Sequence, residues 1–301
     1  MRIAVDAGHG SNTAGKRTPP MPYDIDFNKD GIIDVKKGES IREHVANANV
    51  AYLLIKELER CGLETFMSGF NDSNPYDDKD IPLSERQRAI VNAKCDYSIS
   101  IHFNAYGDGN TFNSAEGVGI YIHNQYLKDS EKLAKSVLKY LLMGTSQKDR
   151  GITKQALAMC NCNALNVKAA ILVEAAFMTN EREATELMAS ADFWKETAIE
   201  IAKGVCEYVG KKYIEEPIMP SKTISKKSSV YDIKWVQTRL NAVLSKEESF
   251  IPLVVDGVFG NKTRIAVLIY WERLGWNKDG VDTGWNVGKA TINALYSGRT
   301  K

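Results

Sequence analysis

Short β-branched or apolar runs alternate with longer amphipathic segments over the first two thirds of the chain. The runs that predict strands are residues 3–5, 63–67, 97–101, 117–122 and 169–173. Apolar residues at helical spacing predict helices over 40–62, 82–94, 129–143, 181–189 and 193–213. This alternation predicts an α/β fold, with a mainly parallel twisted sheet flanked by helices.

The periodicity stops after this region. Residues 214–229 contain Pro217, Pro220, several serines and several lysines, a composition typical of a linker. Residues 230–301 then contain three short helical segments and Trp235, Trp271 and Trp285, which predict a small all-α three-helix domain with a tryptophan-rich core. We therefore expect a main domain at 1–213, a linker at 214–229 and a second domain at 230–301.

Residues 40–62 show the clearest helical pattern. Ser40 and Glu43 form an S-x-x-E start signal, and Gly62 is a typical end signal. Glu43 therefore has a purely structural explanation as a helix cap. His44 has no partner at metal-ligand spacing and is expected at the surface or behind a ligand.

Two histidines and a glutamate each follow a predicted strand. His9 lies in the glycine-rich turn of VDAGHG, His102 follows 97–101, and Glu174 follows 169–173. The carboxyl ends of parallel strands meet at one sheet edge, and Glu43 can reach the same edge.

Two imidazoles and a carboxylate, with a fourth position open to water, are the donors of a catalytic zinc site. Zinc acidifies a water molecule and polarises a carbonyl, while a further carboxylate moves the proton. This chemistry hydrolyses amides.

These motifs together resemble the zinc-dependent N-acetylmuramoyl-L-alanine amidases of the type-3 catalytic domain. The resemblance covers residues 1–212 and rests on VDAGHG, on Glu43 four residues before Asn47, on SIHFNA and on ILVEAAFMTN. It implies zinc bound by His9, Glu43 and His102. It also implies Glu174 as general base and acid in cleavage of the bond between N-acetylmuramic acid and L-alanine.

Two further residues are candidates for substrate contact. Asn104 follows His102, and Arg150 is expected in a turn with Gly151. Either side chain could instead stabilise its own turn.

The segment 12–39 is longer and more acidic than the compact connection that the family leads us to expect. Within it, DFNKDGIID follows the spacing of an EF-hand-type calcium loop. The predicted ligands are Asp26, Asn28, Asp30, Ile32 and Asp34. Lys37 stands where such a loop carries a bidentate Glu, and the alternative is a solvated Asp- and Gly-rich turn.

The second domain resembles the three-helix peptidoglycan-binding domain through WVQTRLNAVL, VDGVFGNKTRIAVL and GKATINAL. The net charge of the whole chain is +1, and it divides into +6 over 221–301 and −5 over the rest. A basic tail suits an anionic surface, either nucleic acid or a polyanionic cell wall. The resemblance favours peptidoglycan over nucleic acid.

The remaining composition bears on membrane insertion, on the state of the thiols and on where the protein acts. No apolar run of membrane-spanning length occurs, so we expect no membrane insertion, and five scattered cysteines predict reduced thiols. The first residues enter a strand without the pattern of a signal peptide. We expect synthesis in the cytoplasm and action on the wall after release, as for a phage endolysin, or after unconventional export, as for an autolysin.

Two other functions are compatible with this sequence. One is a wall-binding protein whose metal site is degenerate or purely structural, and the other is a zinc peptidase that cuts the stem peptide. The oligomeric state is left open.

Overall fold

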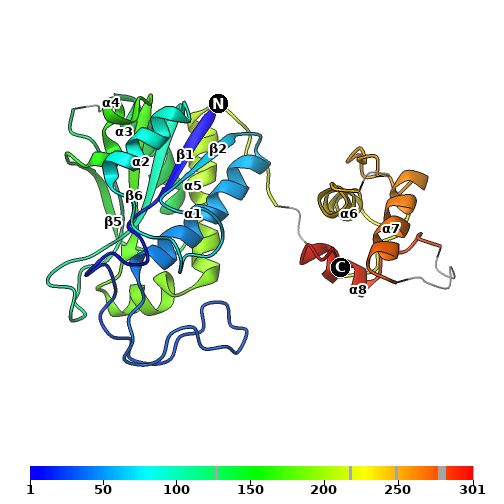
Figure 1. The fold of residues 1–301 in the computed structure, drawn as a ribbon, viewed down its shortest axis with the longest axis horizontal. Coiled ribbons are helices and arrows are strands. Elements are labelled where there is room, and N and C mark those ends of the chain that lie inside the picture. The colour runs from blue at the N-terminus through cyan, green and yellow to red at the C-terminus, as the bar shows by residue number, and fades with distance from the viewer. Residues whose placement is uncertain (126–127, 217–218, 248–249, 277–282, 301) are drawn as a thin grey trace. The chain divides into compact units, whose positions relative to one another are not determined.

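The chain forms two compact units, Met1–Ile214 and Glu215–Lys301, each with its own hydrophobic core (Figure 1). This computed structural model describes residues 1–125, 128–216, 219–247, 250–276 and 283–300. Pro217 of the predicted linker lies outside the described residues. No helix within the described ranges is long and apolar enough to cross a membrane.

The first unit is built on a six-stranded mixed sheet in the order β2-β1-β3-β6-β4-β5. The strands are β1 (Arg2–Ala7), β2 (Glu64–Ser68), β3 (Tyr97–Asn104), β4 (Val118–Ile122), β5 (Asp149–Lys154) and β6 (Ala169–Phe177). β2, β1, β3 and β6 run parallel, whereas β4 is antiparallel to β6 and parallel to β5. The predicted α/β class with a mainly parallel sheet is confirmed.

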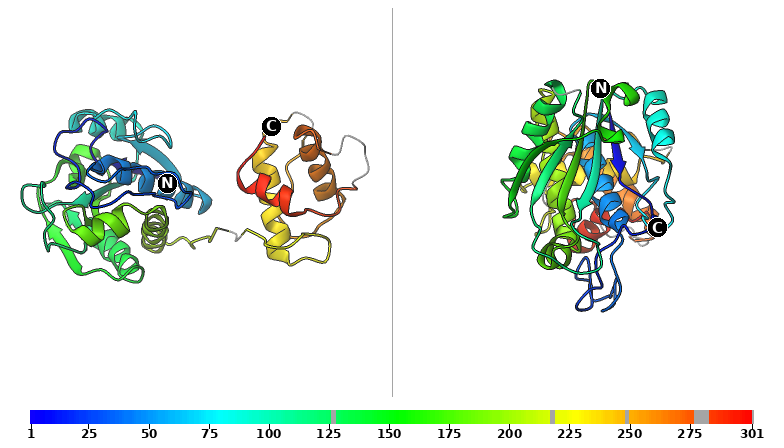
Figure 2. Two further views of the ribbon diagram at one scale, coloured as in Figure 1. Left: turned by 90° about the horizontal axis from the view of Figure 1, so that it is seen from below. Right: turned by 90° about the vertical axis from the view of Figure 1, so that its left-hand side faces the viewer.

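Helices cover both faces of this sheet (Figure 2). α1 (Glu43–Arg60), α3 (Lys128–Leu141) and α5 (Ala191–Tyr208) pack together on one face, while α2 (Leu83–Asn92) and α4 (Cys162–Leu165) pack on the other. Side chains of a strand point alternately to the two faces. Accordingly, Ile3 and Val5 join the core under α1, and Ala4 joins the core under α2.

The predicted boundaries of several elements are wrong, among them those of the elements that carry His102, Glu43 and Glu174. β3 continues to Asn104, so His102 lies within a strand instead of after one. α1 begins at Glu43 instead of residue 40, because residues before it pair with the preceding loop: Ile41 donates its N–H to Thr18 Oγ1, and Arg42 forms a bridge with Arg17. Ser40 is therefore not the N-cap. β6 continues to Phe177, which pairs with Asn104, so Glu174 lies within a strand instead of after one.

One local prediction beyond the metal-ligand candidates is also wrong. Arg150 lies in β5, not in a turn, because residues 149–154 pair with β4. The segment 181–189 is helical as predicted, with π-helical geometry over η2 (Glu183–Met188), and Ser190 caps α5 by accepting the N–H of Phe193. All five cysteines are buried free thiols, as predicted.

The second unit contains three helices in its described part: α6 (Val230–Val243), α7 (Asn261–Arg273) and α8 (Lys289–Tyr296). Trp235 and Trp271 are buried in its core, and Trp271 donates its indole N–H to Thr291 Oγ1. Ser229 caps α6 through the N–H of Asp232. The predicted small all-α region is thus observed.

Candidate metal centre and active site

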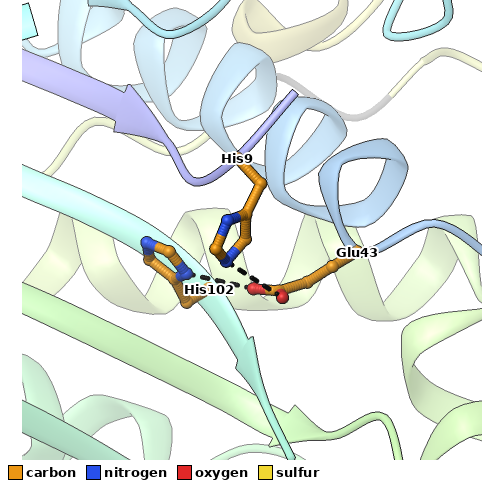
Figure 3. Close-up of side chains that lie close together, drawn as sticks. All are labelled: His9, Glu43 and His102. Atoms are coloured by element: carbon orange, nitrogen blue, oxygen red, sulfur yellow. Dashed lines mark hydrogen bonds and ion pairs between the residues drawn. The ribbon is translucent and has the colours of Figure 1, made fainter. Parts of the chain in front are cut away.

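His9, Glu43 and His102 come together at the carboxyl ends of β1 and β3 and the first turn of α1 (Figure 3). His9 Nε2 lies 3.2 Å from Glu43 Oε2, and His102 Nδ1 lies 3.0 Å from Glu43 Oε1. The two imidazole rings meet edge to face, with centroids 4.9 Å apart. Among the residues that the structure describes, this is the one group whose donor atoms could share a metal ion.

Glu43 is held in place by groups other than the histidines. It is almost fully buried, and its Oε1 accepts hydrogen bonds from the N–H of Phe103 and from Asn47 Nδ2, each at 3.2 Å. Burial alone would raise the pKa of Glu43, but the hydrogen bonds and charges of His102 and His9 hold it well below its usual range. Glu43 is therefore an anionic donor between two imidazoles, and the structure gives it no helix-cap hydrogen bond.

The glycine turn of VDAGHG allows the two rings to approach. A Cβ on Gly8 would lie 2.2 Å from His102 Cε1, so no larger residue fits there without moving that ring. His9 itself has a left-handed backbone with φ of +63°, which is uncommon outside glycine. The turn thus directs the His9 side chain towards α1.

Arg86 of α2 holds this strained turn from behind. Its guanidinium donates to the backbone carbonyls of Ala7, His9 and Ile81 and pairs with the carboxylates of Asp6 and Asp80. The side chain is almost completely buried. The sequence alone does not reveal this role of Arg86, because an arginine in an amphipathic helix is expected at the surface.

His44 and Asn47 fix the same turn from α1. His44 is fully buried, with Nδ1 2.9 Å from the Gly8 carbonyl oxygen and Nε2 3.0 Å from Asp78 Oδ2. Asn47 Nδ2 donates to the same Gly8 oxygen at 3.1 Å. His44 is therefore a supporting residue, one of the two positions expected for it, and not a surface residue.

Glu174 lies beside His102, its partner in the β3–β6 register. Burial raises the pKa of Glu174 to about 8, and the charge of Glu43 adds to this effect while that of His102 opposes it. Its Oε2 is buried, and no group in the described part of the chain hydrogen-bonds to it. A buried carboxylate oxygen without a protein partner suits an exchange of a proton with water or substrate.

A cavity of about 380 Å³ adjoins the two histidines. Its lining includes His9 and His102 together with Asp80, Leu83 and Met159. The histidine rings are thus reachable from an open, partly apolar space, as a substrate site requires.

Asn104 and Arg150, the two candidates for substrate contact, both have partners within the protein. Asn104 ends β3, and its side chain accepts the N–H of Ala105. The Arg150 guanidinium stacks 4.9 Å from the Phe177 ring centroid and donates to the Glu116 carbonyl. Their contact with substrate stays a prediction.

The long loop between β1 and α1, residues 12–39, contains the acidic motif DFNKDGIID and is called the acidic loop below. The polar side chains of this motif bind within the loop itself. Asp26 accepts the N–H groups of Asp30 and Gly31, Asp30 accepts that of Ile32, and Asp34 accepts that of Phe27. Calcium binding by Asp26, Asn28, Asp30, Ile32 and Asp34 stays a prediction without support from this geometry.

Solved structures resemble the first unit in fold, and a family model matches its sequence. No curated protein sequence matches the chain. The solved structure of an N-acetylmuramoyl-L-alanine amidase from Clostridium difficile 630 is 24% identical, with a TM-score of 0.54 over 70% of this chain and 97% of that one. The catalytic domain of the amidase CwlV from Bacillus (Paenibacillus) polymyxa var. colistinus is 24% identical, with a TM-score of 0.52 over 70% and 99% of the two chains.

These two structures share the fold of the first unit. The family model described as N-acetylmuramoyl-L-alanine amidase, Amidase_3, matches residues 3–207, which is more than half of the chain. This chain therefore belongs to the Amidase_3 family of N-acetylmuramoyl-L-alanine amidases.

Proposed function

We propose that this protein is a zinc-dependent peptidoglycan hydrolase that cleaves the amide between N-acetylmuramic acid and L-alanine. The observation that carries the proposal is the convergence of His9, Glu43 and His102 beside Glu174. Two imidazole nitrogens and one carboxylate oxygen are the donor types that catalytic zinc takes, and they leave further positions for water and substrate.

His9, Glu43 and His102 would hold the zinc ion. Bound zinc would acidify water and polarise the scissile carbonyl. Glu174 would take the proton from the attacking water and return it to the leaving amine of L-alanine. The buried Oε2 of Glu174, without a protein hydrogen-bond partner in the described residues, supports this role.

We further propose that the second unit tethers the enzyme to its polymeric substrate. The sequence from 221 to 301 carries a net charge of +6, which favours an anionic wall. Tyr231, Val254 and Val258 are strongly exposed on this unit, as in many binding faces. A tether raises the local concentration of catalytic units on the wall.

Digestion of purified peptidoglycan tests the activity. We expect new L-alanine amino termini and no new reducing sugars, with loss of release after chelation and recovery with zinc. New cuts within the stem peptide would indicate a peptidase instead. Wall binding without any release by the zinc-loaded protein would indicate a binding protein with a structural metal site.

A further inference from the structure

The catalytic unit has a second cavity that shares no lining residue with the one beside His9 and His102. It measures about 630 Å³ and is open to solvent. Its walls come from the acidic loop between β1 and α1, the loop that follows β2, the exposed side of α1 and the start of α5 (Figure 1). The acidic loop does not line the cavity beside His9 and His102, but it forms one wall of this second cavity.

The lining combines amides with aromatic rings. Asn28, Asn49 and Asn74 each bring an amide to the lining. Each amide makes a local hydrogen bond, to Asp30, Val45 and Tyr76 respectively, and keeps further capacity to donate or accept. Tyr52 and Tyr76 supply the rings, and Tyr76 is 59% exposed. Tyrosine presents a flat apolar face with a polar tip, which suits ligands with both C–H faces and hydroxyl groups.

The charges in the lining nearly balance. Asp34 and Asp192 are opposed by Lys195. Such a pocket lacks the concentrated charge that a phosphate or a polyanion requires. Neutral, polar ligands with flat apolar faces, such as N-acetylated sugars, match it better.

Buried anchors hold both loops in position. Phe27 of the acidic loop accepts the Ala191 N–H at 2.9 Å and stacks on Trp194 with ring centroids 5.1 Å apart. The opposite loop is fixed by the buried contact of Asp78 with His44. Because these contacts hold the walls in place before a ligand binds, binding would cost little conformational entropy.

We propose that this cavity is a glycan subsite, which binds a disaccharide-sized segment of an N-acetylhexosamine strand away from the scissile amide. Its volume lies in the range of about 300–1,000 Å³ that holds ligands of this size. The identification of that strand with peptidoglycan rests on the proposed function. Occupation of both sites by one strand would favour polymeric over short substrates.

Binding of tetra-N-acetylchitotetraose to the full chain tests this subsite without any hydrolysis. Hydrogen–deuterium exchange locates the contact, and calorimetry measures its strength. We expect protection of residues 26–34 and 73–76. Tyr76→Ala should weaken binding about fivefold through loss of ring contact, and Tyr76→Phe should retain it.

Tyr23→Ala is the matched control, because Tyr23 is a half-exposed tyrosine of the acidic loop that does not line the cavity. It should leave the affinity unchanged. Protection confined to the second unit or to the His9 edge would overturn the proposal, as would equal weakening by Tyr23→Ala or no binding at millimolar sugar. Because binding is read directly, a failed amidase assay leaves this result interpretable, and a failed binding assay leaves the amidase proposal standing.

Discussion

At the scale of single residues, the geometry of the candidate metal centre depends on a glycine and on buried polar side chains. Gly8 has no Cβ, which lets the His102 ring lie against the turn, and His9 adopts a left-handed backbone. The carbonyl of His9 accepts a hydrogen bond from Arg86, and that of Gly8 contacts His44 and Asn47. The strain of this turn is offset by hydrogen bonds to its backbone oxygens.

The first prediction concerns Arg86→Lys. Lysine keeps the charge but cannot reach three carbonyls and two carboxylates together, so the His9 turn should loosen. We expect the zinc affinity to fall about tenfold, measured by competition with a chelator. Arg88→Lys, an exposed arginine in the same helix, is the control and should bind zinc normally. Unchanged zinc affinity in Arg86→Lys would show that Arg86 supports only the fold.

The second prediction concerns Glu174→Gln. Glutamine keeps the shape of the side chain but cannot take a proton, so turnover of peptidoglycan should fall at least about a hundredfold. The zinc content, measured by elemental analysis, should remain that of the wild type. Glu181→Gln, at an exposed site, should retain full activity. Full turnover in Glu174→Gln would remove Glu174 from the proposed mechanism.

The third prediction concerns Glu200 of α5, far in sequence from the candidate metal ligands. Burial raises its pKa to about 8, and the nearby charge of Glu196 adds to the shift. The unfolded chain has the ordinary value of 4.5, so this group favours the folded state fully below pH 4.5 and loses that effect as the pH rises to 8.

Glu200→Gln removes the ionisation. The free energy of unfolding of the variant, relative to the wild type, should therefore increase between pH 5 and pH 8.5, by about 1 kcal/mol after allowance for solvent screening. Urea unfolding at several pH values measures this difference. Parallel pH profiles for the two proteins would contradict the assignment.

At the scale of elements, α1 organises the site although none of its residues lies in the sheet. Glu43 supplies the carboxylate between the two histidines, while His44 and Asn47 hold the turn after β1. His44 also binds Asp78, which ties the loop after β2 to the same helix. One helical turn thus connects both loops of the sheet edge.

The fourth prediction follows from this connection. His44→Ala leaves the buried Asp78 without its partner and opens a cavity, so the catalytic unit should lose about 2–4 kcal/mol of stability. Chemical unfolding of the full chain measures this loss. Lys56→Ala, on the exposed side of the same helix, should change stability by less than about 0.5 kcal/mol. A loss in His44→Ala as small as in this control would mean that the buried contacts contribute little.

At the scale of the whole molecule, each of the two units has its own hydrophobic core. The catalytic core lies around the sheet, and the second core contains Trp235 and Trp271. Neither tryptophan contributes to the metal centre, so the two units can be perturbed independently. This separation allows the proposed tether to be tested in the full chain.

The fifth prediction is that Trp271→Ala unfolds only the second unit. Removal of this buried indole and its bond to Thr291 should cost about 3–5 kcal/mol, which is comparable to the stability of a small domain. Hydrolysis of a soluble muramyl peptide should remain normal, while cosedimentation with insoluble walls and release from them should fall. Normal cosedimentation of an unfolded second unit would contradict the tether.

The sequence by itself determined the α/β class and the residues of the candidate centre. The VDAGHG turn, the start of α1 near Glu43 and the strand before His102 are local patterns. They follow from glycine conformation and from the periods of strands and helices, which neighbouring residues dictate. Even the extra length of the acidic loop was visible from the chain alone.

Only the tertiary structure decided how these parts meet. Because β4 runs antiparallel to β6, its carboxyl end lies at the opposite edge of the sheet from Glu174. Arg150, expected in a turn, lies in β5 because this segment pairs with β4. The local sequence predicts Arg86 and His44 at the surface of their helices. In the folded unit both side chains are buried, where Arg86 pairs with Asp6 and His44 with Asp78. Strand direction and buried polar pairing depend on contacts between residues distant in the chain, and no local period encodes those contacts.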